Sequence, residues 1–176
     1  MVNDANVIAS APKRERSATD ESGANEAGLA SWLLCRAGVH LCAMPLGQVV
    51  EIMRVLPIES LSGGPPYVRG LCVIRGSPAP VVDTGLLIGD HATRCERFVA
   101  VRTGGRIVAL AVEAVVGIRM LGAEASDQLP PLLRGAAIET IAAIGTLDAE
   151  LLFFLRAARI VPEDLLSPLD AERMAP

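Results

Sequence analysis

Hydrophobic residues recur along this chain in short runs that glycine, proline and polar residues separate. Many runs are rich in valine and isoleucine, and short β-branched runs bounded by turn residues are typical of strands. The pattern therefore predicts an all-β protein of small barrels rather than alternating strands and helices. The expected strands cover residues 32–35, 39–44, 49–55, 71–74, 98–101, 107–112, 115–120, 138–146 and 151–155, with a further strand returning after residue 78.

The clearest hairpin lies between Tyr67 and Asp83. Residues 71–74 are all apolar, and because neighbouring side chains of a strand point to opposite faces, both faces of this strand are expected to be covered. Residues 75–78 mark the turn. Pro78 and Pro80 lie two apart, so their missing N–H groups fall on one side of the returning strand. That end of the strand is predicted to be a sheet edge or a bulge.

Arg75 is the one charged residue between Gly70 and Pro80, and it stands beside the turn glycine Gly76. Glycine lets the backbone bend sharply there, which leaves the guanidinium exposed. The residues alone leave two interpretations open, an exposed cation without a partner or a recognition residue. Gly70 and Gly76 are expected first of all to satisfy backbone geometry.

Two more tight hairpins are predicted, one through residues 103–106 with adjacent glycines and one through residues 147–150. Residues 84–89 are expected to form one helical turn, with Asp83 or Thr84 as its cap. Asp83 is interpreted as a structural residue that caps this turn or bonds the loop, rather than as a phosphoacceptor.

The ends of the chain are expected to differ from its centre. Residues 1–28 mix charges with alanine and serine, which predicts a disordered tail, and residues 168–176 are expected to fray. A folded region, either one ordinary domain or two small interlocked ones, is predicted over 29–167. It contains a long connection at 121–135 and ends in a short C-terminal helix beginning near Pro162.

The composition argues against several classes of function. Hydrophobic residues make up 51% of the 176 residues, yet no apolar run approaches the about 20 residues that cross a bilayer. Aromatic residues are 3% and the net charge is −4, which argues against nucleic acid as a partner. The four cysteines form no C-x-x-C pair and are expected to be reduced. The chain start lacks a secretory signal pattern, so a cytoplasmic location is expected.

Catalytic patterns are absent from the sequence. His40 and His91 have no neighbouring cysteine or carboxylate at metal-ligand spacing, and no G-x-S-x-G motif surrounds Ser77. Gly63 and Gly64 precede prolines, which cannot donate N–H groups to a phosphate. We therefore expect no enzymatic activity, no cofactor and no metal site.

The motif Y-V-R-G-L-C-V-I-R-G-S-P-A-P-V-V-D at 67–83 resembles that of the CheW family of chemotaxis coupling proteins. The similarity extends to V-V-E-I at 49–52, I-V-A-L-A-V-E-A-V at 107–115 and I-A-A-I-G-T-L-D-A-E-L-L-F-F-L at 141–155. Order and spacing agree over about residues 30–167. Val73, Thr84, Glu113 and the residues 156–159 depart from the family's usual pattern, which leaves the partners open.

This resemblance implies two small five-stranded SH3-like barrels that share strands. It also implies a non-catalytic adaptor between the cytoplasmic hairpin of a chemoreceptor and the regulatory domain of a CheA-type histidine kinase. Such an adaptor is cytoplasmic and reaches membrane-bound receptor arrays only through the receptors. Carried over by position, the candidates for the receptor groove are Val49, Gly70 and Phe98, and Glu51 with Arg75 is the candidate exposed recognition pair. No kinase contact is assigned.

The alternative is a small-barrel module that binds protein, ligand or nucleic acid outside chemotaxis. A nucleic-acid barrel would need a basic face with stacking aromatic residues, which this composition does not favour. An exposed apolar groove would favour the adaptor, because a receptor helix docks by burying an apolar stripe.

Overall fold

The computed structural model describes residues 29–61, 63–89, 91–122, 127–128, 140–156 and 160. Its helices are the short 3-10 helix η1 (Leu46–Gln48) and the α-helix α1 (Thr84–Ile88). The strands are β1 (Leu29–Ala37), β2 (His40–Pro45), β3 (Val49–Arg54), β4 (Val68–Ile74), β5 (Ser77–Asp83), β6 (Arg97–Thr103), β7 (Arg106–Val112), β8 (Ala114–Gly122), β9 (Asp127–Gln128), β10 (Ile141–Leu147) and β11 (Glu150–Leu155).

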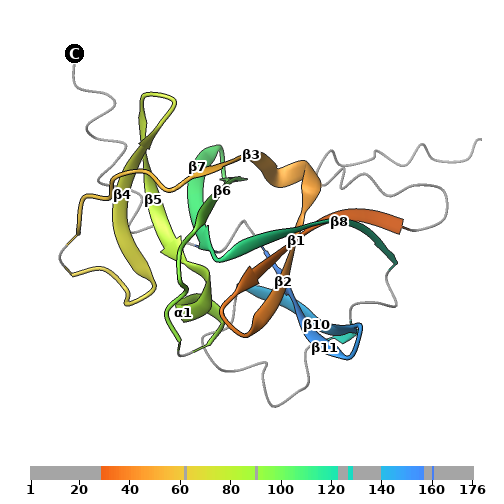
Figure 1. The fold of residues 1–176 in the computed structure, drawn as a ribbon. Coiled ribbons are helices and arrows are strands. Elements are labelled where there is room, and N and C mark those ends of the chain that lie inside the picture. The colour runs from red at the N-terminus through yellow and green to blue at the C-terminus, as the bar shows by residue number, and fades with distance from the viewer. Residues whose placement is uncertain are drawn as a thin grey trace, which may run out of the picture.

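The strands form two sheets (Figure 1). One has the order β8-β1-β2-β11-β10-β9 and belongs to what we call the first barrel, while β3-β6-β7-β5-β4 belongs to the second barrel. The expected all-β fold is thereby confirmed, with the two-residue strand β9 added at one edge. Within the described residues each strand pairs in one sheet only, and the two barrels share a hydrophobic core.

The buried apolar side chains of the described residues form three hydrophobic clusters. The interbarrel core packs one face of each sheet against the other and includes Leu33, Met44, Val99 and Leu110. The second-barrel core lies on the opposite face of β6 and contains Phe98, and the first-barrel core contains Phe154. Because successive side chains of a strand point to opposite faces, β6 supplies residues to two of these cores.

The predicted hairpins are confirmed. Arg75 and Gly76 join β4 to β5 with φ values of 51° and 76°, and positive φ at both positions matches the twist of a two-residue hairpin. Gly104 and Gly105 do the same between β6 and β7. The β10–β11 turn places Ala149 in the left-handed region as well, although it is not a glycine.

The prolines of β5 act as predicted. Residues 81–83 pair with β7 in parallel, and Val81 and Val82 also pair with β4 on the other side, whereas the section that contains Pro78 and Pro80 pairs with β4 alone. A missing N–H group on the free side costs no ladder hydrogen bond. The strand therefore becomes an edge where its prolines stand.

The expected burial of both faces of β4 is wrong at Val73. Cys72 and Ile74 are buried in the second-barrel core, but the Val73 side chain is 66% exposed. β4 is the last strand of its sheet, and Val73 lies near the hairpin tip on the other face. An edge strand can thus leave an apolar side chain in solvent that an inner strand would cover.

Some predictions lie outside the described residues, namely the N-terminal tail, the C-terminal helix and most of the connection 121–135. The strand expected at 138–146 begins at Ile141 in the structure. In the ranges that are described, no helix has the length and apolar character needed to span a membrane.

Candidate functional site

Glu51 and Arg75 form an exposed ion pair. The Arg75 Nε atom donates to Glu51 Oε1 at 2.7 Å, and the side chains are 64% and 32% exposed, respectively. Glu51 belongs to β3 and Arg75 to the β4–β5 turn, although β3 and β4 are the opposite edges of their sheet. The contact therefore requires the sheet to curl back on itself, and it brings the two candidate residues together.

Stability does not account for Arg75. A residue with a side chain at a left-handed φ costs on the order of 1 kcal/mol relative to glycine. An exposed ion pair stabilises the folded state by about 0.2–1 kcal/mol. Since the two effects are of similar size, the main consequence of Arg75 is a charged group presented at the end of the second barrel.

The three receptor-groove candidates do not meet on one exposed surface. Phe98 is fully buried in the second-barrel core. Val49 is partly buried and packs against the interbarrel core, on the other side of the same sheet. Gly70 is buried as well. Of the three, Val49 alone retains a partly exposed side chain.

Gly70 serves backbone geometry. The loop after β3 runs along β4, where the N–H and C=O groups of Glu59 and Leu71 exchange two hydrogen bonds of 2.8 Å. A Cβ atom on Gly70 would lie 2.1 Å from the Glu59 carbonyl oxygen, and its φ is 141°. A side chain is therefore excluded. Gly76 has open space around it and is required for its φ of 76° alone.

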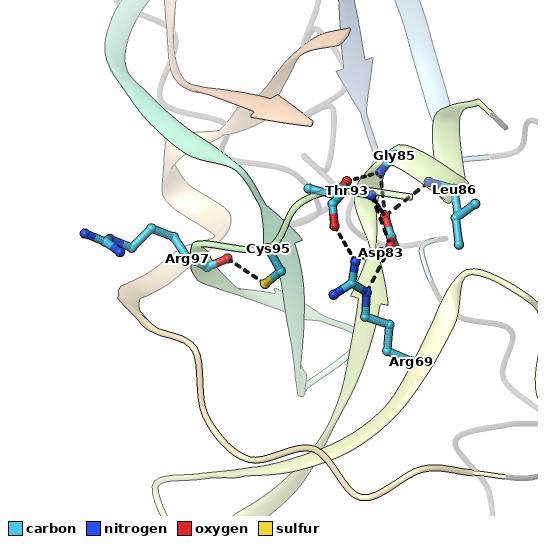
Figure 2. Close-up of polar contacts among 7 residues, drawn as sticks. All are labelled: Arg69, Asp83, Gly85, Leu86, Thr93, Cys95 and Arg97. Carbon is cyan, nitrogen blue, oxygen red and sulfur yellow. Dashed lines mark hydrogen bonds and ion pairs between the residues drawn. The ribbon is translucent and has the colours of Figure 1, made fainter. Parts of the chain in front are cut away.

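A hydrogen-bond network around the buried Asp83 side chain joins strands of the second barrel to the segment that follows them (Figure 2). Asp83 Oδ1 accepts from the N–H groups of Gly85 at 3.0 Å, Leu86 at 3.2 Å and Thr93 at 3.0 Å. Its Oδ2 accepts from Arg69 Nε at 2.9 Å, and another Arg69 nitrogen donates to the Thr93 carbonyl. The network ties β4, β5, α1 and the following loop together.

Burial raises the pKa of Asp83, but the hydrogen bonds from Thr93, Arg69 and Leu86 outweigh that effect, so the pKa is lowered overall. Asp83 is therefore an ionised cap of α1, as its position before residues 84–89 predicted. The role of Arg69 was missed. Since the turn at Arg75 sets the register of the hairpin, Arg69 and Asp83 could have been placed near each other from the sequence.

Apolar side chains reach solvent where the interbarrel core ends. Ile118 on β8 is 53% exposed and pairs across to Leu33, which is buried in that core. Met120 lies two residues further on the same strand and is also exposed. Because β8 is an edge strand, its side chains at this end are covered from one side only. No sequence motif points to a function for these two residues.

The thiols offer no reactive group in the core. Burial raises the pKa of Cys35 to about 12 and raises that of Cys42 as well. Neither forms a thiolate near neutral pH. Within the described segments, no three His, Cys, Asp or Glu side chains are grouped so that they could hold a metal ion.

Comparison with known proteins agrees with this architecture. The family model described as CheW-like domain matches residues 31–164. A search of curated protein sequences found no match. The solved structure of the scaffolding protein TtCheW from Thermoanaerobacter tengcongensis superimposes with a TM-score of 0.63 at 17% identity, covering 74% of this chain and 90% of that one.

The structural match supports the fold, and the family model spans most of the chain. This chain belongs to the CheW-like domain family.

Proposed function

We propose that this chain is a non-catalytic adaptor that couples the cytoplasmic tips of chemoreceptors to a CheA-type histidine kinase. The observation that carries the proposal is the exposed Glu51–Arg75 pair. It lies at the end of the second barrel and adds little to the net stability of the fold. A charge pair of this kind orients and selects a partner more than it adds affinity. We assign it as the exposed recognition pair of the adaptor.

The receptor surface in this proposal includes Val49, Ile118 and Met120. Val49 packs at the margin of the interbarrel core, and Ile118 is exposed beside a residue of the same core. An amphipathic receptor helix would bury its apolar stripe against such side chains. Gly70 and Phe98 act indirectly, because they hold β4 and β6 in place from within the second barrel.

The cellular setting follows from the partners. The adaptor is cytoplasmic and joins the membrane only through receptor arrays. Its second partner is the regulatory domain of the kinase, whose contact residues we leave unassigned.

A reconstituted assay of receptor fragment, kinase and this chain tests the proposal. Arg75→Glu places two carboxylates side by side, and we expect it to lower receptor-coupled kinase phosphorylation by about tenfold while the melting temperature stays nearly unchanged. Arg36→Glu is the control, because Arg36 also forms a solvent-accessible ion pair, with Glu150 at 2.8 Å in the first barrel, where the two side chains are 36% and 51% exposed.

The wild-type chain should restore coupling and Arg36→Glu should keep it. An unfolded Arg75→Glu protein would remove the functional interpretation of that residue. A wild-type chain that binds neither receptor nor kinase would refute the adaptor function.

A further inference from the structure

Two arginines stand opposite each other on neighbouring strands of the second barrel. The antiparallel register of β3 and β6 pairs Arg54 with Arg97, and both side chains are exposed. Figure 2 shows the Arg97 side chain extending away from the Arg69–Asp83 network. Directly opposed residues of this kind have Cβ atoms about 4.5–5.5 Å apart, so two like charges share a small area of surface.

Neither Arg54 nor Arg97 forms an ion pair with an acidic side chain within the described ranges. The ion pairs found there use Arg36, Arg69, Arg75 and Arg94. Glu96 is adjacent to Arg97 in sequence, but its carboxylate is bonded to Arg94 at 3.0 Å. Arg97 donates to the Glu96 backbone carbonyl, a neutral acceptor, at 2.7 Å. Opposed like charges destabilise a sheet unless a ligand of opposite charge joins them.

An exposed apolar side chain lies beside the two cations. Ile52 is 46% exposed and pairs with Val99 two residues before Arg54 pairs with Arg97, so these side chains share one face of the sheet. Val99 itself is buried in the interbarrel core. We call Ile52, Arg54 and Arg97 the diarginine patch.

We propose that the diarginine patch binds an acidic segment of a partner protein, with one carboxylate between the two guanidinium groups and an apolar side chain on Ile52. Arginine is suited to this because its planar fork binds carboxylates with good geometry. Only two cations and one aliphatic residue are present, whereas an anionic membrane surface is recognised by clusters of about four to eight cations. A nucleic acid is disfavoured by the net charge of −4 and the 3% aromatic content.

The first test uses a probe of known chemistry. A synthetic peptide of glutamate and leucine residues is titrated into the full chain at low salt, next to an analogue in which glutamine replaces each glutamate. We expect the acidic peptide to shift the amide resonances of residues 52–54 and 97, and the analogue to leave them in place. The double variant R54E/R97E should weaken binding by about tenfold or more.

R102E and R97E serve as a matched pair. Arg102 is exposed on the same strand, and each substitution changes the net charge equally. R97E should also remain folded, since its carboxylate would face Arg54. A loss of peptide binding in R97E with binding kept in R102E supports the patch. Equal losses in both variants, or equal binding of the glutamine analogue, would overturn it.

The identity of the partner rests on the proposed function, while the charge of its contact segment does not. The same variants are therefore tested against the receptor fragment and the kinase regulatory domain separately, and the protein whose binding R97E weakens selectively is the partner. If the wild-type chain binds neither, the adaptor function fails while the peptide titration still decides the patch. Self-association abolished by R97E, without peptide binding, would overturn the proposal in favour of a second copy of the chain.

Discussion

Arg75 reaches Glu51 at 2.7 Å across the two ends of a five-stranded sheet. Glu51 lies in the edge strand β3, and Arg75 lies in the turn after the other edge strand, β4. The pair marks where the second barrel closes, and it stays largely in solvent. Because this ion pair is exposed, a binding partner can contact it directly.

Replacing Arg75 by glycine separates stability from recognition. Arg75→Gly loses an ion pair worth about 0.2–1 kcal/mol but relieves a left-handed φ that costs a similar amount. We expect the free energy of unfolding, measured by denaturant titration, to change by less than about 1 kcal/mol. Kinase coupling should nevertheless fall as it does for Arg75→Glu. A variant with full coupling would show that the guanidinium has no role in recognition.

Gly70→Ala is expected to destabilise the fold strongly. The new Cβ atom would lie 2.1 Å from a carbonyl oxygen that is itself hydrogen-bonded, so the loop after β3 would have to move. Strain and overpacking together predict a loss of about 2–4 kcal/mol in unfolding free energy.

Gly117→Ala is the control for this substitution. Its φ of 145° nearly equals the 141° of Gly70, but no atom lies within 4 Å of the added Cβ. The difference between the two variants therefore isolates the clash from the backbone conformation. Equal losses would show that the clash contributes nothing.

Asp83 should make stability depend on pH in the acid range. Its pKa in the folded chain is below the ordinary value of 3.8, so the unfolded chain binds a proton that the folded chain does not. The stabilisation is fully present above the unfolded pKa of about 4 and is lost as pH falls through the folded pKa.

Asp83→Asn should reduce the loss of unfolding free energy that accompanies acidification. It should also lower the unfolding free energy near neutral pH by about 2–4 kcal/mol, because Arg69 loses its buried partner. Urea titrations between about pH 2.5 and 7 measure both effects. Glu150→Gln provides the comparison, since its ion pair with Arg36 is exposed. If the stability of Asp83→Asn falls with acidification as it does in the wild-type chain, Asp83 is not the cause of the pH dependence.

Ile118→Ser tests the proposed receptor surface. The side chain is 53% exposed, so its loss should change unfolding free energy by less than about 1 kcal/mol. Binding of a receptor fragment, measured by calorimetry, should weaken by about tenfold if an apolar stripe is buried on it. Leu151→Ser is the control, because Leu151 is 59% exposed on β11. Similar losses in both variants would argue against a defined surface at β8.

The hairpins and the helix cap could be predicted because their causes are local. Glycine beside Arg75 permits the turn, the prolines of β5 remove N–H groups from one side, and Asp83 precedes a short helical segment. The pairing of Glu51 with Arg75 was predicted from a family resemblance, since the residues lie 24 positions apart. Sequence pattern alone would not have joined them.

What the sequence by itself determined was the all-β class, the turns and the exposure of Arg75, because turn residues and strand periodicity act over a few positions. Tertiary structure decided which apolar residues are buried, because that depends on what covers each face. It left Val73 exposed on an edge strand, placed Phe98 in a core away from Val49, and set Arg54 opposite Arg97 through a register that only the paired strands define.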